Sequence, residues 1–136
     1  MSASDSLENN FLDVFVGNSA TSATLQLGAL GLNVGDPTDA GSGGSEASGG
    51  GYARVAVSNT DFAAASGGSI STSGAVSFPE STGTISSGST LSHVRFETAT
   101  TAGTFLGSLA LTTGRAVSAS GVTLQFASGA LTLTAD

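Results

Sequence analysis

The sequence predicts an all-β fold, an antiparallel β-sandwich or jelly-roll-like domain of about eight short strands with one short N-terminal helix. Three observations predict this fold class. Apolar and polar residues alternate with a period of two in most segments after Gly17, which is the pattern of half-buried strands. Gly- and Ser-rich turns separate these segments, and a single segment near the N-terminus has helical spacing instead. Short strands joined by frequent turns are typical of sandwiches and jelly rolls.

The predicted helix covers residues 5–16. Its apolar residues recur at the spacing of one helical face, and Gly17 follows at the position where helices commonly end. The residues of this face are Leu7, Phe11, Leu12 and Phe15. The helix either packs on its own domain or serves as an arm that docks on a neighbouring subunit. We accordingly expect residues 1–17 to form an N-terminal helical arm and residues 18–136 to form a single β-sandwich domain.

The predicted strands differ in how clearly their two faces can be told apart. The segment at residues 91–99 alternates most clearly, with Val94 and Phe96 on one face and polar residues on the other. The segment at residues 104–112 is strongly apolar, which predicts burial on both faces or at an interface. The remaining strands are predicted at residues 23–32, 52–57, 69–78, 115–118, 122–127 and 131–134.

A long Gly-rich loop, residues 35–51, follows the first predicted strand. Loops of this length within a compact domain are usually functional or mobile. Asp36, Asp39 and Glu46 place three carboxylates in the loop, and Ca²⁺ is bound by oxygen ligands of this kind. Their spacing does not match the helix–loop–helix calcium pattern, so we favour a solvated loop with Asx turns. We predict no metal and no cofactor.

The charge of the chain excludes several classes of partner. The formal net charge is -7, with three arginines and no lysine, whereas nucleic acids and anionic membranes are bound through clustered basic residues. Arg54, Arg95 and Arg115 lie far apart in the sequence and make no obvious basic patch. We therefore expect neither nucleic acid nor a membrane as a partner.

Small residues dominate the composition. The 136 residues include 23 Ser, 17 Thr, 20 Ala and 20 Gly, and such residues contribute little hydrophobic free energy when they are buried. A single chain would therefore have a thin apolar core. Association of several copies is a direct way to bury more apolar surface, so we expect a homo-oligomer.

No catalytic site is evident in the sequence. His93 is the single histidine, on the polar face of its predicted strand with Arg95 and Glu97. The chain has no G-x-S-x-G elbow that would pair a nucleophile with this histidine, so we expect His93 to make surface or cross-strand hydrogen bonds. Glu80 and Glu97 have no partners that identify a glycosidase-type carboxylate pair. We predict that the protein is not an enzyme.

Two short motifs carry a resemblance to a known family. Residues 36–41 read DPTDAG and residues 49–54 read GGGYAR. The chain resembles, at these motifs and in the layout of its helix and strands, a family of short virion proteins of tailed bacteriophages that are commonly labelled tail fibre proteins. Similar small β proteins also serve as cement or decoration proteins on phage heads, and the resemblance implies a virion component.

The resemblance implies a non-enzymatic structural protein of the virion. We favour a capsid cement or decoration protein that binds the head surface as a homotrimer and stabilises capsomer contacts. The alternative is a tail fibre or receptor-binding module that recognises host surface glycans. Expected partners are further copies of the chain and the major capsid protein or other virion proteins. The residues expected to contact partners are Leu7, Phe11, Leu12, Phe15, Asp36, Asp39, Tyr52 and Arg54.

The expected location is the virion, after synthesis in the host cytoplasm. The first ten residues lack the basic segment of a secretory signal. No run of the sequence approaches the roughly 20 apolar residues that a membrane-spanning helix needs.

Overall fold

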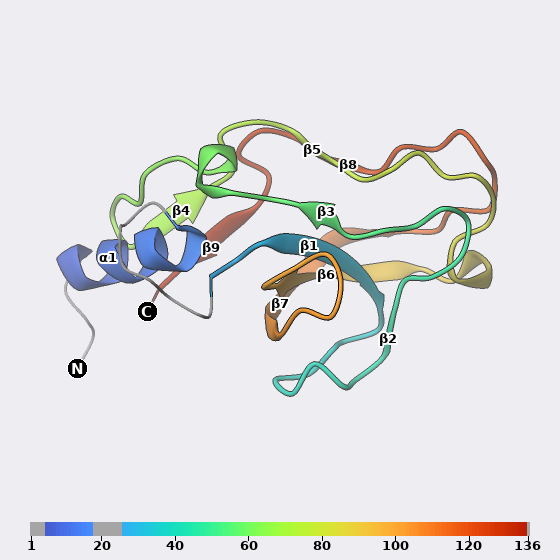
Figure 1. The fold of residues 1–136 in the computed structure, drawn as a ribbon, viewed down its shortest axis with the longest axis horizontal. Helices are drawn as coiled ribbons and strands as arrows, with labels where there is room; N and C mark the ends of the chain where they lie inside the picture. The colour runs from blue at the N-terminus through green and yellow to red at the C-terminus, as the bar shows by residue number, and fades with distance from the viewer. Residues whose placement is uncertain (1–4, 18–25, 136) are drawn as a thin grey trace. The chain divides into compact units, whose positions relative to one another are not determined.

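The computed structural model describes residues 5–17 and 26–135, and within these ranges the protein is mostly β-structure with one short α-helix (Figure 1). The all-β prediction and the helix predicted at residues 5–16 are both confirmed. Two short 3₁₀-helices cover Asn59–Asp61 and Ser86–Gly88. The remaining elements are α1 Asp5–Val16, β1 Ala29–Val34, β2 Ser45–Glu46, β3 Val55–Ala56, β4 Ser69–Ser71, β5 Val76–Ser77, β6 Leu91–Glu97, β7 Phe105–Arg115, β8 Gln125–Phe126 and β9 Thr132–Thr134.

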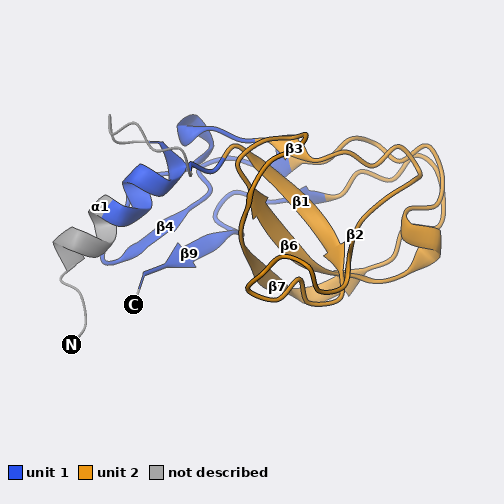
Figure 2. Ribbon diagram, turned by 60° about the horizontal axis from the view of Figure 1, so that its bottom comes forward, with its two compact units in different colours: residues 1–27, 57–76, 125–136 blue, residues 28–56, 77–124 orange. Residues whose placement is uncertain are grey.

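The chain divides into two compact units, each built from segments that are separated in the sequence (Figure 2). Unit 1 consists of residues 1–27, 57–76 and 125–136. Unit 2 consists of residues 28–56 and 77–124. The prediction of a helical arm followed by one β-sandwich domain over residues 18–136 remains a prediction.

Unit 2 contains the main sheet, with strand order β2-β1-β6-β7 and with β3 also paired to β1. All of these pairs are antiparallel. The register of β1 and β6 places Leu30 opposite Phe96 and Leu32 opposite Val94, and these four side chains are buried. Because side chains alternate along a strand, the apolar face of this strand pair is buried as the sequence pattern predicts.

Unit 1 contains α1 and the two-stranded sheet of β4 and β9. The helix lies against β4, and β4 pairs antiparallel with β9, with Ile70 opposite Leu133. The buried side chains of α1 are Leu12 and Val16, which are one helical turn apart and so lie on one face. The backbone N–H of Ala65 also donates to Oδ1 of Asp13, at 3.1 Å. The helix is therefore held by burial of Leu12 and Val16, by this hydrogen bond and by a bond from the N–H of Leu27 to the carbonyl oxygen of Phe15.

Several strands differ from the sequence prediction in their bounds. The segment predicted at residues 69–78 is divided between β4 and β5, because the first pairs with β9 and the second with β8. The strand predicted at residues 23–32 begins later, at Ala29, and residues 23–25 lie outside the described part of the chain. In the long loop, Glu46 pairs with Asn33 and forms β2. An alternating pattern indicates where a strand lies. The residues at which the strand begins and ends depend on its pairing partners, which are distant in sequence.

Candidate functional site

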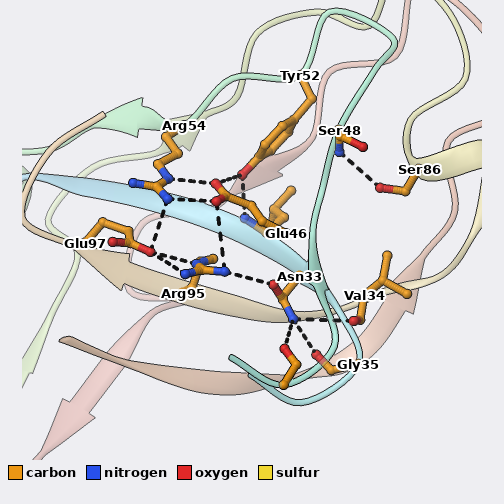
Figure 3. Close-up of polar contacts among 12 residues, drawn as sticks. Asn33, Val34, Gly35, Glu46, Ser48, Tyr52, Arg54, Ser86, Arg95 and Glu97 are labelled. Atoms are coloured by element: carbon orange, nitrogen blue, oxygen red, sulfur yellow. Dashed lines mark hydrogen bonds and ion pairs between the residues drawn. The ribbon is translucent and has the colours of Figure 1, made fainter. Parts of the chain in front are cut away.

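Six polar side chains meet over one face of β1 and β6 in unit 2 (Figure 3). They come from β1, from β2, from the segment before β3 and from β6. We call this group the polar cluster; its members are Asn33, Glu46, Tyr52, Arg54, Arg95 and Glu97. This face of the sheet is the opposite one from the apolar face of Leu30 and Val94, since the cluster residues occupy the alternate positions of both strands.

Small residues on β1 make room for large ones on β6. Gly31 lies opposite Arg95, and Ala29 lies opposite Glu97. A Cβ added at Gly31 would lie 2.9 Å from Cγ of Arg95 and 3.0 Å from the hydroxyl of Tyr52, both closer than ordinary van der Waals contact. Gly31 is therefore required by the packing of the cluster, and not by an unusual backbone angle.

Arg95 and Glu97 form the buried centre of the cluster. Nε and NH2 of Arg95 both lie 2.7 Å from Oε1 of Glu97, and NH1 donates to Oδ1 of Asn33 at 3.1 Å. The Glu97 side chain is only 1% exposed. Its second oxygen, Oε2, has no hydrogen-bond partner among the described residues. A buried carboxylate with one unpartnered oxygen depends strongly on the cations that hold the other one.

Arg54 and Glu46 form a second, bidentate pair. Nε of Arg54 lies 2.6 Å from Oε1 of Glu46, and NH2 lies 2.7 Å from Oε2. Arg54 also joins the two pairs, because NH2 lies 3.3 Å from Oε1 of Glu97, and NH1 donates to the carbonyl oxygen of Ala99. NH1 of Arg95 lies 3.9 Å from Oε2 of Glu46, so each of the two arginines is paired with both glutamates. Two arginines and two glutamates thus neutralise one another within the cluster.

Tyr52 and Asn33 attach the cluster to the backbone around it. The Tyr52 hydroxyl accepts a hydrogen bond from the N–H of Leu32 at 2.8 Å and donates to Oε1 of Glu46 at 3.2 Å, while its ring stacks on Phe78. Nδ2 of the fully buried Asn33 donates to the carbonyl oxygens of Gly35 and Gly43. The cluster therefore holds both ends of the loop between β1 and β2.

The strand β7 covers part of the cluster from the side. The guanidinium carbon of Arg95 lies 5.1 Å from the centroid of the Phe105 ring, a distance at which a cation is attracted to the face of an aromatic ring. A Cβ at Gly41 would overlap this ring, at 2.5 Å from its Cγ. The β1–β2 loop and β7 thus both pack on the edge of the cluster.

The environment of the cluster shifts the pKa of three of its members. Burial alone would raise the pKa of Glu46, but the hydrogen bonds and charge of Arg54, together with the charge of Arg95, outweigh it and lower the pKa below 4.5. Burial raises the pKa of Tyr52 well above its usual range, and the neighbouring Glu46 adds to the increase. The hydrogen bond to Glu46 raises the pKa of Arg54. These shifts favour a charged Glu46–Arg54 pair and a neutral Tyr52 at neutral pH.

The structure brings some of the predicted loop residues together and keeps others apart. Tyr52 and Arg54 meet in the cluster with Glu46. Asp36 and Asp39 lie exposed in the β1–β2 loop, where Oδ1 of Asp36 accepts a hydrogen bond from the N–H of Thr38 at 2.8 Å. That bond is the Asx turn predicted for this loop. Within residues 5–17 and 26–135, no group of three acidic or histidine side chains could hold a metal ion.

The predicted helical residues lie in unit 1. Leu12 is buried and Phe15 half-buried, whereas Phe11 is 62% exposed. The side chain of Leu7 lies outside the described residues. The residues of the single predicted face therefore differ in burial: Leu12 is buried, whereas Phe11 is mostly exposed.

Sequence reasoning missed Asn33, Arg95 and Glu97 as members of a site. Arg54 and Arg95 are far apart in the sequence, but in the structure they share the carboxylates of Glu46 and Glu97. The face of β6 that was expected to be polar carries these charges in the interior instead of in solvent. The available signal was the Arg-x-Glu pattern of β6 together with the Gly-x-Asn pattern of β1, since a glycine in a strand marks close approach by another group.

His93 hydrogen-bonds to its neighbour on the same strand, and not at the surface or across the sheet as the sequence predicts. Nδ1 of its half-buried ring lies 2.9 Å from Oγ of Ser92, and Ser92 Oγ also accepts a hydrogen bond from the N–H of Gly35. The residue lies opposite Asn33 on β1 and Ala110 on β7. It contributes to the hydrogen bonding of the sheet at the margin of the cluster.

The family model described as Gp80, podophage GP4 fiber I protein gp80, matches residues 2–134. No curated protein matches the chain. Among the described residues, no helix has the length and apolar character needed to span a membrane.

Proposed function

We propose that this chain, which belongs to the family of the podophage GP4 fiber I protein gp80, is a structural subunit of a virion fibre and has no enzymatic activity. The observation that carries the proposal is the family match, which extends over residues 2–134. A fibre-type structural protein of a bacteriophage virion is the class that this membership establishes. We propose the fibre because the description of the matched family names a fibre protein; the capsid cement role that the sequence favours remains a prediction.

The polar cluster supports a structural role for the residues of the GGGYAR segment. The guanidinium of Arg54 is held by two glutamates and a backbone carbonyl, and the hydroxyl of Tyr52 is held by Leu32 and Glu46. A glycan-binding site needs polar groups that are free to exchange water for sugar hydroxyls. We therefore propose that Tyr52 and Arg54 stabilise unit 2, and that any receptor contact is made by other residues.

The helix α1 supports a role in attachment to the virion. Leu12 and Val16 are buried within unit 1, whereas Phe11 leaves most of its ring in solvent. Aromatic side chains are frequent anchors in protein interfaces, because they bury a large area with few rotatable bonds. We propose that Phe11 anchors the subunit on a neighbouring virion protein, with Phe15 at the margin of the contact.

Immunogold labelling of intact particles tests the location. Gold on the fibres is the expected result. Gold distributed over the head surface would contradict the fibre proposal and would favour a cement or decoration protein instead.

A pair of adjacent substitutions tests the attachment. Phe11→Ala is expected to reduce incorporation into particles about tenfold or more while leaving the melting temperature unchanged, because the lost ring is an exposed anchor. The matched control, Leu12→Ala, removes a buried side chain of the same helix and should lower the melting temperature, yet the folded fraction should still be incorporated. Normal incorporation of Phe11→Ala would contradict the attachment role.

A further inference from the structure

We infer that the outer edge of β7 is a self-association surface that pairs with β7 of a second copy of this chain. β7 is the last strand in the order β2-β1-β6-β7, and its one partner among the described strands is β6. The other side of the sheet ends in β2 and β3, which have two residues each. β7, with 11 residues, is therefore the one long edge of the sheet in the described part of unit 2. An edge strand presents backbone N–H and C=O groups that a further strand can pair with.

The side chains of β7 fit a contact that is not present in a single chain. Its large apolar residues are all half-exposed, in contrast to the buried Leu91, Val94 and Phe96 of β6. These half-exposed residues are Phe105, Leu106, Leu109 and Leu111. Residues 105–111 contain no charge and no proline, so the strand lacks two of the devices by which exposed edges usually resist pairing.

Two irregularities in the β6–β7 register limit the part of β7 that can pair by its backbone. One falls between Phe105 and Gly107, and the other falls between Ala110 and Arg115. Bulges twist an edge away from a regular ladder. The backbone pairing we infer is accordingly confined to residues 107–110, with Leu106 and Leu111 flanking it as apolar contacts.

The distribution of charge favours a second copy as the occupant. Two chains with a net charge of -7 each repel one another wherever acidic residues meet. None of the ten acidic residues lies between Glu97 and Asp136, and the single charge in that stretch is Arg115. In an antiparallel pair of β7 strands, the two copies of Arg115 lie at opposite ends of the contact. β7 is thus a surface on which copies of this acidic chain can meet without like-charge repulsion.

Sedimentation of the purified full chain tests the inference, with a pair of charge-matched variants. We expect the wild type to associate in a concentration-dependent manner. Leu111→Lys places a charge at the contact and removes an apolar side chain, and should raise the dissociation constant about tenfold or more. Thr123→Lys adds the same charge at an exposed position away from β7 and should associate as the wild type does.

Hydrogen exchange of the wild type provides the second measurement, which does not depend on any variant folding. Amide protection within residues 107–110 should increase with protein concentration at the N–H groups that are not paired with β6, while protection in β8 stays constant. The inference is overturned by a wild type that stays monomeric at all concentrations, or by Leu111→Lys associating normally. It is also overturned by β7 amides that are fully protected in the monomer, because another segment of the chain would then cover the edge. These results do not depend on where in the virion the subunit lies.

Discussion

The two faces of the β1–β6 strand pair are both buried, but they are built on different principles. One face carries Leu30 and Val94, whose burial is non-directional and depends mainly on volume. The other carries Arg95 and Glu97, whose burial is favourable only while each charge keeps its partners at hydrogen-bond distance. We expect the apolar face to tolerate substitutions of similar volume, and the charged face to tolerate almost none.

The largest expected effect comes from removing one cation of the charged face. Arg95→Met leaves Glu97 with Arg54 alone, at 3.3 Å, and deprives Oδ1 of Asn33 of its donor. Loss of one partner of a buried ion pair costs about 3–5 kcal/mol, and urea denaturation should show a decrease of this size in the free energy of unfolding. Combining Arg95→Met with Glu97→Leu should recover a large part of the loss. A double variant no more stable than the single one would show that the penalty does not come from the stranded carboxylate.

On the apolar face, the free energy of unfolding should depend on the volume of the side chain and little on its shape. Leu30→Ala is expected to cost about 2–5 kcal/mol, because the cavity left by a fully buried leucine collapses only in part. Leu30→Met, which nearly conserves the volume, should cost less than about 1.5 kcal/mol. Equal costs for the two variants would mean that this face is as demanding as the charged one.

A smaller effect is expected where the charged face meets the backbone. In Gly31→Ala the new methyl group would lie within 3.2 Å of Arg95, Tyr52 and Glu46, and such overpacking costs about 1–3 kcal/mol. Gly74→Ala is the matched control, since a Cβ there meets nothing within 4 Å, and it should change the stability by less than about 0.5 kcal/mol. Thermal denaturation of both variants separates crowding from a general effect of replacing glycine.

The smallest effect is a dependence on acid pH that belongs to the charged face alone. Because the pKa of Glu46 is lowered in the folded state from its ordinary 4.5, its contribution to stability is present above that value. It is lost as the pH falls through the lowered pKa. The melting temperature of the wild type should therefore decrease on acidification below about pH 4.5. Glu46→Gln should reduce this decrease, and an unchanged acid profile would mean that other carboxylates cause it.

The sequence was sufficient for features whose causes are local. α1 was predicted at residues 5–16, the bounds it has in the structure, because helical spacing and the stop at Gly17 act within a few residues of each other. The alternation of β6 likewise assigned Val94 and Phe96 to one face. Local patterns could not reveal that the other face is also buried. That depends on the segment before β3 covering the sheet, which places the Tyr52 hydroxyl beside Gly31 and the Arg54 guanidinium against Glu46.

The candidate site was only partly predictable for the same reason. The GGGYAR motif singles out Tyr52 and Arg54 as residues expected to contact partners, and the structure places both in the polar cluster. Their partners are Glu46, which β2 brings to the sheet, and Glu97, which lies more than forty residues further along the chain. The pairing of β1 with β6 creates this site, and no pattern in either strand alone specifies the register.

Unit 1 is built from three separate segments of the chain, so it can fold completely only after the last of them has been synthesised. β4 pairs with β9, so β4 cannot form its two-stranded sheet until residues 132–134 have been synthesised. The residues of unit 2, by contrast, have all been made once Leu124 has been added. A released chain that ends between these points would carry all the residues of unit 2 together with an unpaired β4, with Ile70 lacking its partner Leu133. Such a chain exposes a strand edge and apolar surface together, so loss of the last few residues is expected to reduce how much of the protein reaches assembly in soluble form.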